Sequence, residues 1–482
     1  MDINQYKEKL VNNTIWNAIE RYSILGIQLL CTFILGRFLT PEDFGIVGML
    51  VVFTTISCTI IDSGFCQAFI REKNITNIDY SSVFYFNVVL SVFLYAILFF
   101  SSGLIADFYH QPILKDICKV TFLVLPCSAL NLVQSTILIR NLQFKKHCVI
   151  SLCAVVFSSI ITITFAYYKP NVWALVIQNL STYLLRSLFL WISVSWRPSL
   201  VFSMKSIKRL FTFSKNLLFT GLIGDIFNNI YPILIGHYYT AADLGYYSLA
   251  DRTKTIASYT STKVIQGVTY PILSRINNEG GNLREAYRNI IIISVIFVGS
   301  IMTLLMSISF DIFEVLLGDK CWRTAGTYLF ILCISGIMYP LHAINQNILL
   351  VKGESRTVLF LELTRRCIMI FILVLALQFD IIVLVWSGVV YSFLLLFLNL
   401  YYCGKPINYG TWDQFKDLIP IIFRFIIMLV STLCVSCFIE DMHILLRIVV
   451  SLCVCSFSGY LLFYKNIYFQ KIQRVFFDKI KV

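Results

Sequence analysis

The sequence has no polar stretch long enough to fold as a soluble domain, since no segment between its apolar runs exceeds roughly twenty residues. Charged residues make up only 13% of the chain and hydrophobic residues 58%, with a mean hydropathy of +0.78. This composition lies beyond that of ordinary soluble domains. G-x-S-x-G, Walker A and H-E-x-x-H motifs are also absent, and the five histidines are scattered singly along the chain. These absences argue against a soluble enzyme.

Metal-ligand patterns are missing as well. The fifteen cysteines include no paired C-x-x-C array of the metal-ligand type, and most stand within apolar segments. We therefore interpret them as small packing residues, and we expect neither disulfides nor a bound metal. The first residues, Met1–Val11, are polar and carry no cleavage pattern, so we expect no secretory signal peptide.

What the chain does have is apolar runs of about 20 residues, each enough to cross roughly 30 Å of hydrocarbon. They follow one another from end to end and predict an all-α integral membrane protein with about 14 transmembrane helices. The predicted spans are 13–38, 44–66, 81–104, 117–138, 148–168, 172–195, 210–237, 241–274, 287–317, 325–351, 355–378, 381–402, 418–438 and 443–464.

The net charge of +13 reports topology. If the amino terminus is cytoplasmic, 23 lysines and arginines fall in the inner loops and tails and 6 in the outer loops and their edges. The positive-inside rule then places both termini in the cytoplasm. No segment remains for a polyanion-binding domain, so we expect no nucleic-acid partner. The tail 465–482 has apolar residues at helical spacing and predicts an amphipathic helix on the inner leaflet.

Two windows 200 residues apart repeat one another. Gly36-Arg-Phe-Leu-Thr-Pro-Glu-Asp-Phe-Gly-Ile46 matches Gly236-His-Tyr-Tyr-Thr-Ala-Ala-Asp-Leu-Gly-Tyr246 at both glycines, the threonine and the aspartate. Each Thr-x-x-Asp tetrapeptide is close to a capping box and predicts the start of a helix. The duplication indicates two homologous halves. Since each half has an even number of spans, we expect the halves to be parallel repeats related by an axis along the membrane normal.

Ionisable residues at membrane depth are costly and mark candidate functional sites. In the predicted span 241–274, Asp251, Arg252 and Lys254 would lie about 15–20 Å from its start. A wide polar face runs along this helix as far as Gln266, and we expect it to line a wet cavity. Arg21, Asp225, Asp251, Arg252, Lys254, Lys263, Arg365 and Arg366 form the candidate substrate-binding set. The residues leave two interpretations open: Asp225 pairs with Arg252 or Lys254, or these cations meet an anionic ligand.

Four segments carry a family resemblance: Asp62-Ser-Gly-Phe-Cys-Gln-Ala-Phe-Ile-Arg71, Tyr270-Pro-Ile-Leu-Ser-Arg-Ile276, Leu317-Gly-Asp-Lys-Cys-Trp322 and Asn345-Gln-Asn-Ile-Leu-Leu-Val-Lys-Gly353, which leads into Glu362. They resemble Wzx-type polysaccharide flippases of the multidrug/oligosaccharidyl-lipid/polysaccharide exporter superfamily, in particular the colanic-acid and teichuronic-acid exporter branch. The likeness covers roughly residues 10–400. Cys321 interrupts the family's Gly-acid-Lys-Trp run.

The resemblance implies two six-helix lobes around a central cavity plus two C-terminal helices. The lobes would cover 1–200 and 201–403, with two extra helices and the tail in 404–482. It also implies transport by alternating access of an undecaprenyl-diphosphate-linked oligosaccharide from the inner to the outer leaflet of the bacterial cytoplasmic membrane, for surface polysaccharide biosynthesis. We expect no catalytic residues and no cofactor apart from a coupling ion, H⁺ or Na⁺. The phospholipid membrane is the second partner, and polysaccharide polymerase machinery is a further candidate.

Two alternatives stand beside the flippase. An ion-coupled exporter of small cationic molecules from the same superfamily would need an acid-rich cavity, whereas the deep charges here lean basic. A membrane polysaccharide polymerase or ligase would need a sizeable outer loop, and the sequence has none.

The charge asymmetry predicts that the termini face the cytoplasm and that the Lys115, Lys169 and Lys320 loops lie outside. In a cysteine-free background, single cysteines placed at Ser206 and Gln473 should resist a membrane-impermeant thiol reagent in intact cells. The same reagent should label a cysteine placed at Lys169. Labelling of Ser206→Cys or Gln473→Cys from outside would overturn the topology.

Overall fold

The computed structural model describes residues 3–318, 320–439 and 442–464, so the predicted tail helix 465–482 lies outside the described residues. Within them the secondary structure is helical, with two short 3-10 turns and no strand. Contacts divide the chain into two compact units, residues 1–248 and 249–482. We call these unit 1 and unit 2.

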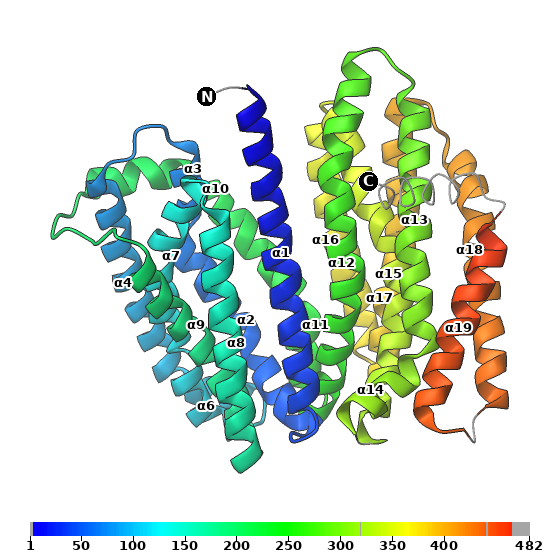
Figure 1. Ribbon diagram of the computed structural model, residues 1–482, viewed down its shortest axis with the longest axis horizontal. Coiled ribbons are helices and arrows are strands. Elements are labelled where there is room, and N and C mark those ends of the chain that lie inside the picture. Colours follow the sequence, from blue (N-terminus) through cyan, green and yellow to red (C-terminus); the bar gives the residue numbers. More distant parts are fainter. Residues whose placement is uncertain (1–2, 319, 440–441, 465–482) are drawn as a thin grey trace. The chain divides into compact units, whose positions relative to one another are not determined.

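Unit 1 is a bundle whose longer helices run roughly alongside one another (Figure 1). Helix α10 packs on α2, α3 and α4, and α11 packs on α2. The core consists of apolar side chains between these helices, such as Phe65 and Val83, both fully buried. Its helices are α1 (Ile3–Leu35), α2 (Pro41–Asp62), α3 (Phe65–Arg71), α4 (Asn77–Phe100), α5 (Ser102–Phe108), α6 (Leu114–Thr121), α7 (Val124–Arg140), α8 (Phe144–Tyr168), α9 (Trp173–Ser193), α10 (Met204–Asn228), α11 (Ile230–Tyr238) and the first turns of α12 (Ala241–Asn278).

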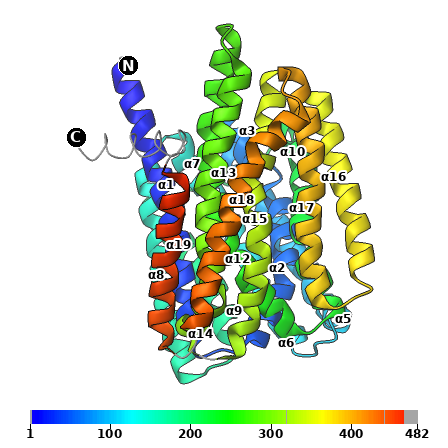
Figure 2. The same cartoon turned by 90° about the vertical axis from the view of Figure 1, so that its right-hand side faces the viewer.

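Unit 2 holds the rest of α12 and a second set of roughly parallel helices (Figure 2). Helices α18 and α19 pack on each other and on α13. One core cluster joins α13, α15, α17, α18 and α19 through residues such as Tyr287, Ile344 and Phe425. The remaining elements are α13 (Leu283–Ser307), α14 (Ser309–Leu317), η1 (Lys320–Trp322), α15 (Arg323–Val351), α16 (Ser355–Ala376), α17 (Ile381–Gly404), η2 (Lys405–Ile407), α18 (Thr411–Phe438) and α19 (Ile444–Phe463).

Each of the fourteen predicted spans coincides with helix in the structure. By length and apolar composition, however, 11 helices qualify as membrane spans among the described residues, or 12 if the bent pair α10 and α11 is one span. The count of fourteen is therefore not confirmed. Of the predicted spans, those that coincide with α12 and α16 do not qualify, because charged and polar residues lower their hydropathy. These are also the helices that carry most of the predicted site residues.

The duplicated windows form the predicted capping boxes. The Asp43 amide donates to the Thr40 hydroxyl at 3.4 Å, and the Thr40 amide donates to the Asp43 carboxylate at 2.9 Å. Thr240 and Asp243 make the same two bonds at 3.1 and 3.2 Å. Both helix starts are thus fixed locally by their own sequence.

The two repeats also touch each other at these helix starts. A Cβ atom on Gly45 would lie 1.7 Å from the carbonyl oxygen of Ala241, and one on Gly245 would lie 1.9 Å from the carbonyl oxygen of Pro41. Pro41 corresponds to Ala241 and Gly45 to Gly245, so each repeat makes the same contact with the other. A reciprocal contact of this kind is what a local two-fold axis produces. It confirms that the two turns lie at the same end of the structure.

The division of the chain differs from the predicted boundary at residue 200, because contacts group α10, α11 and the start of α12 with unit 1. These segments pack on α2 and its neighbours, which explains the grouping. The assignment of 1–200, 201–403 and 404–482 as two lobes and an extension stays a prediction of the sequence.

Gly45→Ala and Gly245→Ala should each destabilise the protein, because the added methyl group would overlap a backbone carbonyl that cannot rotate away. Overpacking of this kind costs about 1–3 kcal/mol or more. We expect a lower midpoint temperature for loss of the monodisperse peak when detergent-solubilised protein is heated. The matched control is Gly26→Ala in α1, since nothing lies within 4 Å of a Cβ at that position. Equal midpoints for all three variants would contradict the close contact.

Candidate functional site

Unit 1 contains a network of polar side chains inside its helices. His147, at the start of α8, holds its Nδ1 atom 2.9 Å from a carboxylate oxygen of Glu20 on α1. Both side chains are largely buried, with exposed fractions of 9% and 12%. A carboxylate at this depth is stable only with a partner, because transfer of an unpaired charge from water to an apolar interior is costly.

The second ring nitrogen of the same imidazole, Nε2, contacts side chains from two further helices. His147 Nε2 lies 2.7 Å from the Ser135 hydroxyl of α7 and 3.2 Å from a guanidinium nitrogen of Arg186 on α9. A guanidinium can only donate, so Nε2 is the unprotonated nitrogen and Nδ1 carries the hydrogen that is donated to Glu20. One imidazole thus joins four helices.

Unit 2 contains a second buried network, which includes Arg365 and Arg366 of the predicted set. Glu362 and Arg365 of α16 pair at 2.7 Å, and Arg366 lies 3.9 Å from the same carboxylate. Arg365 also donates to the side-chain oxygen of Asn399 on α17 at 2.6 Å. The Asn399 amide nitrogen lies 2.7 Å from His342 Nδ1 of α15. The network therefore ties α15, α16 and α17 together.

Helix α12 carries the other predicted cations. Lys254 pairs with Asp251 of its own helix at 2.5 Å. Arg252 and Lys263 are exposed, and they lie eleven residues apart, which is close to three full turns and therefore one helix face. Lys263 stands 5.3 Å from the ring of Tyr259 on that face. We call Arg252, Tyr259 and Lys263 the basic face of α12.

The sequence predicts that the whole polar face of α12 lines a wet cavity. This prediction is wrong for the side of α12 that carries Ser258 and packs on α15. Ser258 is buried and donates to the carbonyl of Gly336 in α15 at 2.9 Å. In a regular helix that carbonyl would accept from residue 340, but Pro340 has no amide hydrogen. The Gln266 amide donates to the carbonyl of Ala343 at 3.0 Å, and the Asn347 amide donates to the backbone carbonyl of Gln266 at 3.1 Å. These polar side chains therefore satisfy backbone and amide groups of α15 instead of facing water.

Two predicted residues lie in unit 1. Asp225 of α10 is half-buried and accepts a hydrogen bond from the Thr59 hydroxyl of α2 at 2.5 Å. Lys254 pairs with Asp251 of its own helix, and the two interpretations left open for Asp225 stay predictions. Arg21 of α1 is exposed, next to Glu20.

Several members of these networks were not among the residues predicted from the sequence. Arg186 and Asn399 stand in strongly apolar segments, where the cost of a polar side chain was a usable signal. His147 and His342 appear isolated along the chain because their partners come from other helices. Only the tertiary packing brings these residues together.

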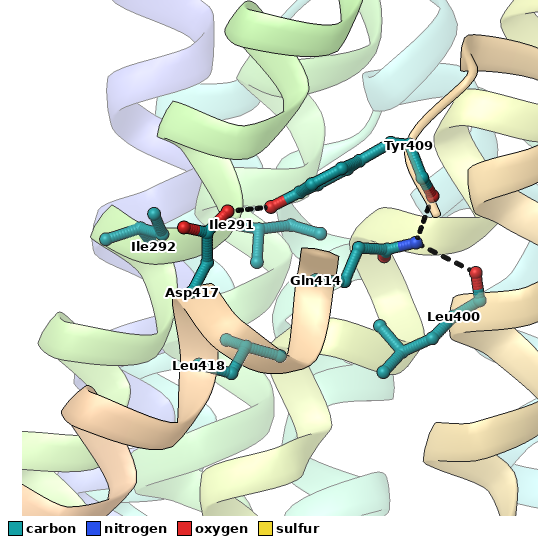
Figure 3. Close-up of a pocket in the computed structure, with 7 residues that line it drawn as sticks. All are labelled: Ile291, Ile292, Leu400, Tyr409, Gln414, Asp417 and Leu418. Carbon is teal, nitrogen blue, oxygen red and sulfur yellow. Dashed lines mark hydrogen bonds between the residues drawn. The ribbon is translucent and has the colours of Figure 1, made fainter. Parts of the chain in front are cut away.

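A small pocket lies where α17 ends and α18 begins (Figure 3). The Gln414 amide donates to the carbonyls of Leu400 and Tyr409 at 2.9 and 2.8 Å, and the Tyr409 hydroxyl donates to Asp417. The space open to water centres is about 10 Å³, at the lower limit for one water molecule. These bonds fix the corner before the last two helices, and the pocket is too small for a substrate. Among the described residues, no group of three or more His, Cys, Asp or Glu side chains could hold a metal ion.

Comparison with solved structures shows which fold the chain has. The fold is similar to the lipid II flippase MurJ in its inward closed conformation, with a TM-score of 0.72 at 14% identity over 95% of this chain and 100% of that one. An inward-facing MATE family multidrug resistance transporter of the MOP superfamily gives 0.61 at 14% identity over 80% and 98%. The chain thus has the helical membrane fold that these two transporters share.

Residues 34–326 match the family described as polysaccharide biosynthesis protein, and the chain belongs to it. Teichuronic acid biosynthesis protein TuaB of Bacillus subtilis is 24% identical over 72% of both chains. Lipopolysaccharide biosynthesis protein WzxC of Escherichia coli is 23% identical over 69% of this chain and 68% of its own. Succinoglycan biosynthesis transport protein ExoT of Rhizobium meliloti is 22% identical over 69% and 67%.

Ser258→Ala should destabilise the protein by about 1–3 kcal/mol, because the Gly336 carbonyl would lose its hydrogen bond while buried. In a Pro340→Ala background the new amide at 340 can bond to that carbonyl, so the same substitution should cost less. The two effects are compared as midpoint temperatures in a double-mutant cycle. Ser300→Ala is the matched control, since its hydroxyl bonds to Ile296 within its own helix. Equal costs of Ser258→Ala in both backgrounds would exclude the compensation.

Proposed function

We propose that this transporter carries an undecaprenyl-diphosphate-linked oligosaccharide from the inner to the outer leaflet of the bacterial cytoplasmic membrane. The family assignment and the relatives of polysaccharide biosynthesis support the class of substrate. The observation that carries the proposal is the basic face of α12, which presents Arg252 and Lys263 within a long helix of a membrane bundle. Placing a cation at membrane depth costs free energy, and such residues are retained where they interact with an anionic group.

The diphosphate is the part of the substrate that these cations would recognise. Arg252 would donate charge-assisted hydrogen bonds to phosphate oxygens, and Lys263 would act as a compact positive charge three turns away. The cations of α16 are committed to Glu362, and the Lys254 ammonium is committed to Asp251. They add to the positive potential of unit 2.

The paired acids argue against a cationic drug as the substrate. A cationic molecule would need carboxylates able to face it, whereas Asp251 is held by Lys254 and Asp225 by Thr59. We also propose that both termini lie in the cytoplasm, as the distribution of lysine and arginine between the loops favours.

Deletion of the gene should remove surface polysaccharide and cause its lipid-linked precursor to accumulate in the inner leaflet, and the wild-type gene should restore export. Arg252→Ala and Lys263→Ala should each reduce export strongly at unchanged protein level. The loss of one charge-assisted bond, about 1.5–3 kcal/mol, corresponds to a change in affinity on the order of 10- to 100-fold. The Glu variants should be worse, because they add repulsion of the diphosphate.

Arg275→Ala is the matched control, because Arg275 lies on the same helix in an exposed pair with Glu279 and should keep normal export. Normal surface polysaccharide in Arg252→Ala, Lys263→Ala and the double variant would show that the basic face of α12 does not hold the phosphates.

A further inference from the structure

The network around His147 in unit 1 takes no part in the substrate recognition proposed above. It is a site in its own right, because three helices, α1, α7 and α9, each deliver one side chain to the imidazole that α8 carries. Glu20 stands four residues after the start of the apolar segment Trp16–Leu35, about 6 Å along the helix. The network therefore lies near the end of α1 from which the chain enters the bundle.

The charges of this network balance in the arrangement that the structure shows. Glu20 is negative and Arg186 is positive, and the imidazole between them is neutral because Nε2 accepts from Arg186. Within the ring, the lone pair that can take up a proton is on this Nε2 atom, which faces both Arg186 and Ser135.

A proton added to Nε2 changes the contacts of the network. The imidazolium would keep its Nδ1 bond to Glu20, which becomes an ion pair, and it would donate from Nε2 to the Ser135 oxygen. Arg186 would lose its acceptor and face a positive ring about 3 Å away, which is repulsive in a low-dielectric interior. Its Nε atom is already buried without a hydrogen-bond partner, and once His147 is charged Arg186 shares its attraction to Glu20 with the imidazolium.

The other titratable groups near the network do not compete for this proton. Cys148 of α8 interacts with Glu20, and Tyr183 of α9 interacts with Arg186, but a thiol and a phenol are neutral at physiological pH. The neighbouring cations have contacts elsewhere: Lys145 stands over the Trp16 ring, Lys146 donates to the Ser193 carbonyl, and Arg140 donates to Tyr80 and to the carbonyls of Glu72 and Lys73. Arg21, beside Glu20, is exposed.

The same geometry disfavours a metal cation. Hard cations are bound by shells of oxygen atoms, whereas the Glu20 carboxylate oxygen here faces an imidazole N–H and the remaining positions around the ring are taken by a hydroxyl and a guanidinium. A proton is the cation that this set of groups can accept.

We propose that Glu20, His147 and Arg186 form the binding site for the proton that drives transport, with Arg186 released from α8 when the proton binds. The proposal rests on the proposed function, since it names the ion coupled to that transport. Proton uptake would weaken the contact between α8 and α9 and thereby shift unit 1 between two arrangements, as protonation does in other histidine-based switches.

The test uses the full-length protein in vesicles, with lipid-linked oligosaccharide extracted from a deletion strain as the probe. A pH difference of one unit is imposed across the membrane, and the glycan on the outer surface is measured by its oxidation with external periodate. One coupled proton per molecule corresponds to up to about tenfold accumulation per pH unit. Wild type should show this accumulation, and its direction should reverse with the gradient. Glu20→Gln and His147→Asn should equilibrate the probe between leaflets without accumulating it.

His147→Asn removes the titratable nitrogen but keeps an amide donor for Glu20. If Glu20→Gln or His147→Asn fails to elute as folded protein, Arg186→Lys, which keeps the positive charge, serves as the second test variant. Arg186→Lys should retain accumulation but alter the pH at which transport is half-maximal. Glu279→Gln, in the exposed pair with Arg275, is the control for the exchange of Glu for Gln and should behave as wild type.

Gradient-driven accumulation of wild-type size in both Glu20→Gln and His147→Asn would overturn the site. Wild type that equilibrates the probe but ignores the gradient would overturn proton coupling and leave the proposed function intact. Wild type that leaves the probe in its original leaflet would overturn both.

Discussion

In hydrocarbon, a polar group that finds no partner inside the protein has no water to replace it, and most of the polar contacts in this structure follow from that constraint. Pro340 shows it for the backbone. The proline removes one amide hydrogen from α15, so the Gly336 carbonyl loses its partner within the helix. The Ser258 hydroxyl of α12 donates a hydrogen bond to this carbonyl instead. Polar residues of α12 that would be unfavourable against lipid are therefore favourable against a broken helix. The requirement for a partner decides which helix α12 packs on.

The same constraint shapes the charged networks. Each unit has an arginine, a glutamate and a histidine in one partly buried network, and with Ser135 in unit 1 and Asn399 in unit 2 each network joins at least three helices. A buried ion pair is weak support for stability by itself, because desolvation offsets much of the Coulomb attraction. What such pairs provide here is a fixed register between helices and, in unit 1, a neutral imidazole between two opposite charges. That arrangement responds to a single proton, which a purely apolar helix interface cannot do.

The duplicated segments impose a further packing restriction, near the end of α1 that is opposite to Glu20. The backbones of α2 and α12 approach so closely at Gly45 and Gly245 that no side chain larger than hydrogen fits. Small residues that permit such an approach are a common way to hold membrane helices together, because lipid tails compete with larger apolar side chains. The reciprocal form of this contact ties the two repeats of the sequence to one another, and the contact lies within unit 1 although it joins segments 200 residues apart.

The sequence by itself determined the class of fold, because long apolar segments and their caps depend only on nearby residues. The fourteen helical segments, the capping boxes at Thr40 and Thr240 and the duplication could all be read from local patterns. The site was predicted less well. Depth along a helix identified Arg252 and Lys263 as basic residues of α12, but it could not tell which polar side chains face a neighbouring helix, as Ser258 does. Only the tertiary structure decided that His147 joins Glu20 to Arg186, because those residues are 127 and 39 positions away in the chain and meet through packing that no local pattern encodes.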